Sequence, residues 1–89
     1  MKAIITVIGS DRPGIIASVS GLLYKYGANI LDISQTILSG YFTMVTLTDL
    51  TDMTLTYPEM LEQLNALGQE LGVEIRMQRS EIFDAMHRI

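Results

Sequence analysis

Segments with strand periodicity and segments with helix periodicity alternate along this chain in an order that repeats once. Residues 2–9 are a run of β-branched and apolar residues that ends in a glycine, which predicts a strand. Residues 13–27 carry apolar side chains at helical spacing, which predicts a helix. The full predicted order is strand, helix, strand, strand, helix, strand over residues 2–9, 13–27, 29–38, 41–50, 56–72 and 73–78.

Local signals mark the helix starts and one turn. Asp11 is placed to cap the first helix, and Pro13 suits its first turn. Thr56 and Glu59 have the spacing of a capping box immediately before the second helix. Between the second and third strands, residues 39–40 are a Ser-Gly pair, which predicts a two-residue hairpin turn.

The two halves of the chain repeat the same arrangement. The same spacing separates Pro13 from Gly27 and Pro58 from Gly72, which predicts helices of matched length, each leading directly into a strand. This pattern indicates an α+β fold: a ferredoxin-like β-α-β-β-α-β sandwich with a four-stranded antiparallel sheet and both helices on one face. The 89 residues predict one domain over 1–80 and a C-terminal tail over 81–89. In the tail, Ile82, Phe83 and Met86 fit a short helical turn.

Apolar residues occupy both faces of the first and third predicted strands. They are Ile4, Ile5, Val7 and Ile8 on the first strand, and Phe42, Met44, Val45 and Leu47 on the third. Helices on one face leave the other face of a sheet bare, and a bare face in a monomer is normally polar. We therefore expect a homodimer or higher oligomer, with Phe42 and Met44 in the apolar surface that the partner covers.

Composition and charge exclude several classes of protein. The chain has no cysteine, which removes disulfides, thiolate catalysis and cysteine-based metal sites. Its formal net charge is −4 and its six basic residues are scattered, so direct nucleic-acid binding is disfavoured. No apolar run approaches the ~20 residues of a membrane span, and the N-terminus does not resemble a signal peptide. These features predict a cytoplasmic protein without membrane association.

The loop from Asp11 to Gly14 is the strongest candidate for a binding site. It lies between the end of a strand and the start of a helix, where free N–H groups and the helix dipole favour an anion such as a carboxylate. Arg12 offers bidentate contacts to a carboxylate, and Gly14 allows close approach to the backbone. The alternative is structural: Asp11 as a helix cap, Pro13 as a first-turn residue and Gly14 as a packing residue. The residues alone leave both interpretations open.

Asn29 and Asp32 are polar residues on the second predicted strand, which is an edge strand in this fold. Polar residues on an edge discourage aggregation, and the residues alone favour that interpretation. In the functional interpretation they face a ligand held by the first loop, either of the same chain or of a neighbour.

Three segments together resemble ACT domains: residues 8–15 (IGSDRPGI), 27–35 (GANILDISQ) and 42–44 (FTM). The likeness extends from residue 1 to about residue 80 and is greatest to small stand-alone ACT proteins and to the repressor of the glycine cleavage system. It implies a regulatory module that pairs with a second copy and binds an amino acid at the interface. By that resemblance Asp11, Arg12, Gly14 and Asn29 are ligand-binding positions, with Pro13 and Asp32 beside them.

Other functions are compatible with the same fold. Acylphosphatase has an arginine in the equivalent loop, but its glycine-rich phosphate cradle and any nucleophile-base pair are missing here, and His87, the only histidine, lies in the tail. RNA recognition needs a basic surface and stacking aromatic residues on the first strand, which has none. We therefore expect no enzymatic activity, no cofactor and no metal. The remaining alternative is a protein-protein interaction module that uses the open sheet face or edge without a small ligand.

Overall fold

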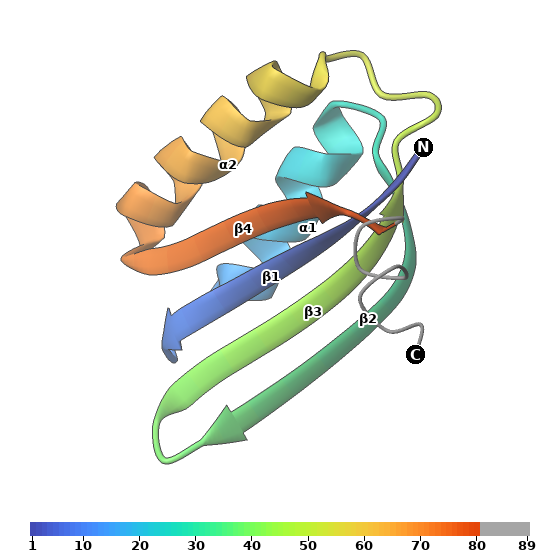
Figure 1. Ribbon diagram of the computed structural model, residues 1–89. Coiled ribbons are helices and arrows are strands. Elements are labelled where there is room, and N and C mark those ends of the chain that lie inside the picture. Colours follow the sequence, from blue (N-terminus) through green and yellow to red (C-terminus); the bar gives the residue numbers. More distant parts are fainter. Residues whose placement is uncertain (81–89) are drawn as a thin grey trace.

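Four strands form one antiparallel sheet, and two helices cover a single face of it (Figure 1). The computed structural model describes residues 1–80. The elements are β1 (Lys2–Ser10), α1 (Ile15–Lys25), β2 (Asn29–Leu38), β3 (Tyr41–Asp49), α2 (Tyr57–Leu71) and β4 (Val73–Arg79). This arrangement confirms the ferredoxin-like fold. The predicted helical turn in the tail lies outside the described residues.

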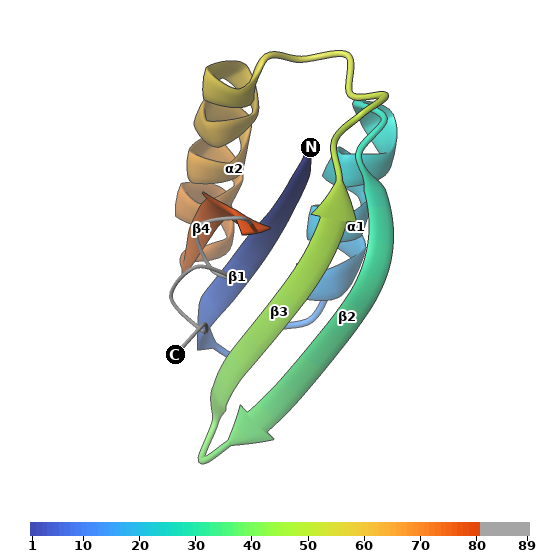
Figure 2. The same cartoon turned by 45° about the vertical axis from the view of Figure 1, so that its right-hand side comes forward.

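The strand order β2-β3-β1-β4 places β1 and β3 at the centre and leaves β2 and β4 as edges. β1 pairs antiparallel with β3 from Lys2 opposite Asp49 to Ser10 opposite Tyr41. The end of β1 and the β2–β3 hairpin therefore meet at the same end of the sheet. In two views this hairpin projects beyond the start of α1 (Figures 1 and 2). β2 is an edge strand, as the sequence predicted.

The core lies between the sheet and the helices. Every second residue of the central strands points into it, because side chains alternate between the two faces of a strand. The helices contribute the residues that recur at three- and four-residue spacing. The core residues include Ala3, Ile5 and Val7 of β1, Ile15, Val19 and Leu23 of α1, Phe42 and Met44 of β3, and Met60 and Leu64 of α2.

The two helices differ in length and in how they begin. α1 has 11 residues and α2 has 15, so the prediction of matched lengths is wrong. At α2 the predicted capping box is present: the Thr56 hydroxyl accepts from the Glu59 N–H, and the Glu59 carboxylate accepts from the Thr56 N–H. At α1 the prediction fails, because Gly14 occupies the cap position and no side chain caps the helix. Asp11 is therefore not the cap, and Pro13 precedes the helix instead of lying in its first turn.

The turn between β2 and β3 matches its prediction. Ser39 and Gly40 have φ values of 53° and 80°, which is the left-handed pair of a type I′ hairpin turn. The pairing of β2 with β3 also contains a register shift between Ile30 and Asp32, which the sequence did not indicate. A bulge of this kind arises from the pairing of two strands and leaves no periodic signal in one of them.

The apolar character of the open sheet face is confirmed, but two of its predicted members are wrong. Phe42 and Met44 are 3% and 1% exposed and belong to the core beneath the helices. The prediction that Phe42 and Met44 lie on the opposite face of β3 from Val45 is correct. Which of the two faces is covered by α1 and α2 depends on how the helices pack on the sheet. On the open face Ile8 is 46% exposed and Val45 41% exposed, so the central strands present apolar surface there.

Candidate functional site

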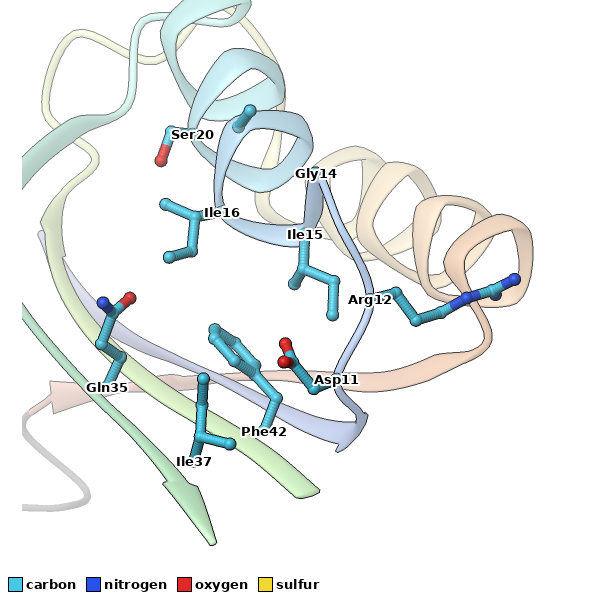
Figure 3. Close-up of a pocket in the computed structure, with 10 residues that line it drawn as sticks. Asp11, Arg12, Gly14, Ile15, Ile16, Ser20, Gln35, Ile37 and Phe42 are labelled. Carbon is cyan, nitrogen blue, oxygen red and sulfur yellow. The ribbon is translucent and has the colours of Figure 1, made fainter. Parts of the chain in front are cut away.

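A cavity of about 510 Å³ lies where the β1–α1 loop, the first turns of α1 and the hairpin end of β2 meet. This volume is within the range of small-molecule sites in proteins. The loop contributes Asp11, Arg12 and Gly14 to its wall, and the buried ring of Phe42 lies between the two sides (Figure 3). The other lining residues are Ile15, Ile16, Ala17 and Ser20 of α1, and Gln35 and Ile37 of β2.

The start of α1 provides hydrogen-bond donors to this cavity. The first N–H groups of a helix have no partner within the helix, and α1 has neither a side-chain cap nor an acidic residue in its first turn. Gly14 holds the cap position with φ of 87°, and a Cβ atom added there would meet no atom within 4 Å. The backbone at this point is therefore open to a ligand, and the helix dipole favours a negative group there.

Asp11 and Arg12 are neighbours that point in different directions. The N–H of Asp11 donates to the Gly40 carbonyl at 3.0 Å, which ties the loop to the hairpin, and its carboxylate is directed into the cavity (Figure 3). The guanidinium of Arg12 turns away from the cavity and donates through Nη1 to the Leu71 carbonyl at 2.6 Å. One of the five Arg12 donors thus binds the C-terminal end of α2, which leaves the others available.

Asn29 and Asp32 lie far from the loop within one chain. Asn29 pairs with Asp49, which is also opposite Lys2 at the start of β1, whereas the loop follows the end of β1. Eight residues of strand separate these levels, roughly 26 Å at 3.3 Å per residue. Asp32 pairs with Leu47 on the open face, and its Oδ1 accepts from the Ile33 N–H at 2.9 Å. Of the predicted site residues, the structure therefore places Asp11, Arg12 and Gly14 on the cavity wall, leaves Pro13 in the loop but off that wall, and separates Asn29 and Asp32 from it.

Sequence reasoning missed the apolar wall of the cavity. Ile16 on α1 and Ile37 on β2 are 36% and 59% exposed, and both line it. Gln35 lies on the same side of β2 as Ile37. The sequence did contain a signal for exposed apolar residues. Ile16 is an apolar residue outside the buried positions of α1, and Ile37 is an apolar residue on an edge strand. Their meeting at one cavity depends on the placement of α1 on the sheet.

Residues 1–80 were compared with the requirements of a metal cluster and of a membrane-spanning helix. Within residues 1–80, no cluster of three or more histidine, aspartate or glutamate side chains has the geometry to hold a metal ion. None of the helices in that part of the chain is long and apolar enough to cross a membrane.

Comparison with known proteins identifies the family of this chain. The family model described as the ACT domain matches residues 2–78. The chain belongs to the ACT domain family. ACT domains are regulatory, ligand-binding modules, and this one has the fold and the loop on which the resemblance in its sequence rests.

Two relatives match this ACT domain over nearly its whole length. A UPF0237 protein of Listeria innocua is 47% identical over 89 residues, covering 100% of both chains. The structure of an ACT domain protein from Streptococcus pneumoniae is 46% identical, covers 98% of both chains and superposes with a TM-score of 0.83.

A second similar structure belongs to a larger protein. It is a putative glycine cleavage system transcriptional repressor, 28% identical to this ACT domain, with a TM-score of 0.73. The match covers 86% of this chain but 44% of the repressor, so this chain corresponds to about half of that protein.

Proposed function

We propose that this protein is a non-catalytic, cytoplasmic regulatory module that binds an amino acid, or a molecule like one, at the interface of a homodimer. The observation that carries the proposal is the cavity beside the start of α1, where uncapped helix N–H groups, the Asp11 carboxylate and apolar side chains surround one space. These are the three kinds of contact that a zwitterion with a side chain requires.

The charges of the cavity suit the two ends of an amino acid. A carboxylate is favoured at the first turn of α1, where Gly14 allows close approach, and Arg12 lies on the same loop with donors to spare. An ammonium group requires an acceptor, and the carboxylate of Asp11 points into the cavity. In this proposal the backbone around Gly14 binds the carboxylate of the ligand, and Asp11 binds its ammonium group. Arg12 contacts the carboxylate when its guanidinium swings from Leu71 toward the cavity, and Pro13 holds the backbone of the loop.

A dimer through β2 would bring the start of the partner's β2 to the level of the cavity. β2 is an edge strand with unpaired backbone groups on its outer side, and Ile33 and Ile37 are exposed on it. Such an edge is a template for pairing with another chain. Antiparallel pairing of two β2 strands about a two-fold axis places the start of one strand beside the end of the other. The partner subunit's Asn29 and the partner subunit's Asp32 would then lie at the level of the cavity, with the partner subunit's Asp32 on the open face of the sheet, opposite the face that carries the cavity.

The site can be tested with two glycine substitutions of equal backbone strain. Gly14 and Gly40 have φ values of 87° and 80°, and a Cβ at either would meet no atom within 4 Å. An alanine in this conformation costs about 1–2 kcal/mol at either position. Only Gly14→Ala places a methyl group in the cavity. We expect Gly14→Ala to weaken amino-acid binding at least tenfold in calorimetry, and Gly40→Ala to leave it unchanged.

Three results would contradict parts of this proposal. Equal losses of affinity in the two glycine variants would place the ligand elsewhere. A monomer in sedimentation at micromolar concentration would refute the dimer interface. If no common amino acid raises the melting temperature, the ligand itself is wrong, since binding to the native state must stabilise it. The last result would favour the second candidate, a protein-interaction module, for which the exposed Ile8 and Val45 of the open face are the supporting observation.

A further inference from the structure

The part of the cavity between the start of α1 and the hairpin end of β2 is apolar. Ile16 of α1 and Ile37 of β2 extend toward the same space from opposite sides, and the ring of Phe42 lies between them (Figure 3). Ile16 and Ile37 are 36% and 59% exposed, so much of their surface is uncovered in the protein alone. A ligand group that covers this surface removes apolar area from water, and its binding gains free energy in proportion.

The polar groups of the cavity are unevenly distributed. Among the described residues that line it, the charged side chains are Asp11 and Arg12, and both belong to the loop. The walls contributed by α1 and β2 carry only two polar side chains, Ser20 and Gln35, and both are neutral. A charged ligand side chain directed along these walls would lose hydration without meeting an opposite charge, which is unfavourable.

From these two features we infer that the site selects amino acids whose side chains are uncharged and apolar, with affinity rising with side-chain length. This inference rests on the proposed function, because it assumes that the α-carboxylate and α-ammonium groups bind at the loop. The ligand side chain then extends from Gly14 along Ile16 and Ile37. The apolar wall is thus the specificity-determining element, and the loop binds the part that all amino acids share.

A homologous series of ligands tests the inference directly. Glycine, alanine, 2-aminobutyrate and norvaline differ by one carbon at each step and share the same charged groups. Each buried methylene should tighten binding about fourfold, which corresponds to about 0.8 kcal/mol. Norleucine and lysine form a second pair of similar length, of which only lysine has a charged end. We expect norleucine to bind at least tenfold more tightly than lysine in isothermal titration calorimetry.

Two variants test whether the apolar wall of the cavity causes the change in affinity along the ligand series. Ile37→Thr keeps a β-branched residue at an exposed strand position and shortens the apolar side chain that faces the cavity. Leu38→Thr is its control, because Leu38 is the next residue of β2, is 73% exposed and does not line the cavity. Ile37→Thr should reduce norvaline affinity about three- to tenfold and leave glycine affinity unchanged. Leu38→Thr should alter neither.

The outcomes separate this inference from the function on which it rests. Binding that tightens along the series, and does so less in Ile37→Thr than in Leu38→Thr, supports it. Amino acids that bind with equal or decreasing affinity along the series overturn the inference and leave the proposed function intact. Lysine binding as tightly as norleucine would have the same consequence. If none of these ligands binds but another common amino acid raises the melting temperature, the inference is overturned and the proposed function stands; if no common amino acid does so, the proposed function is itself refuted.

Discussion

Two threonines on β3 provide a matched test of how the core is stabilised. Thr46 and Thr48 are fully buried, lie on the same face of the same strand and are in the core beneath the helices. The Thr48 hydroxyl donates to the Ala3 carbonyl at 2.9 Å. The Thr46 hydroxyl has no hydrogen-bond partner among residues 1–80. Valine has nearly the same shape as threonine, so replacing each one in turn removes a satisfied and an unsatisfied hydroxyl.

The two substitutions should change stability in opposite directions. Burying an unpaired hydroxyl costs about 1–3 kcal/mol in proteins, so Thr46→Val should raise the free energy of unfolding by about 1 kcal/mol or more. A paired hydroxyl contributes about 1 kcal/mol, so Thr48→Val should lower it by a similar amount. In a domain of this size 1 kcal/mol corresponds to roughly 4–8 °C in Tm.

Differential scanning calorimetry and urea denaturation measure this difference. The urea midpoint should shift while the m-value stays constant, which shows that stability has changed and the extent of unfolding has not. If Thr46→Val is as destabilising as Thr48→Val, the Thr46 hydroxyl has a partner in solution, and the reasoning from its isolation is wrong.

Other predictions concern α2 and the loop. Thr56→Ala removes the capping box and should lower the free energy of unfolding by about 1 kcal/mol in thermal melts followed by circular dichroism; no change would mean that the cap is not formed in solution. The backbone N–H of Thr56, and to a smaller extent its hydroxyl, lower the pKa of Glu59, so this contribution should be complete at neutral pH and lost as the pH falls through the lowered pKa. In Thr56→Ala that loss should become smaller without disappearing, because the backbone N–H of residue 56 remains; an unchanged acid limb would contradict the contribution of the hydroxyl. Arg12→Ala breaks the bond to Leu71 and should lower Tm by a few degrees without ligand, because an exposed charged contact at a helix C-terminus contributes under about 1 kcal/mol. In the same variant amino-acid affinity should fall about ten- to a hundredfold if the remaining donors bind the carboxylate, and an unchanged affinity would restrict Arg12 to its contact with α2.

The fold could be predicted from the sequence because its signals are local. Alternation of apolar residues predicted β4, whose Ile75 and Met77 are buried while the neighbouring Arg76 is exposed. The capping box at Thr56 and the left-handed turn at residues 39–40 depend on the backbone preferences of a few adjacent residues. Such preferences act within one turn or one pair of strands, so they can be deduced from the sequence alone.

The failures share a different origin. Asp11 was expected to cap α1, but its backbone is bound to Gly40, and Gly14 takes the cap position. Phe42 and Val45 were both recognised as apolar residues of β3. Which of the two faces the core depends on where the helices pack, so strand periodicity alone could not distinguish them.

The sequence by itself determined the order of the elements, the loop from Asp11 to Gly14 as the candidate site, and the family. Only the tertiary structure decided that Arg12 contacts Leu71, 59 positions away, and that Asn29 lies at the other end of the sheet. It also created the cavity, by placing Ile37 of an edge strand opposite the first turn of α1. The physical reason is range: hydrogen bonds and side-chain periodicity within an element act over a few residues. The cavity joins segments whose distance in space is set by strand register and by the packing of helices on the sheet.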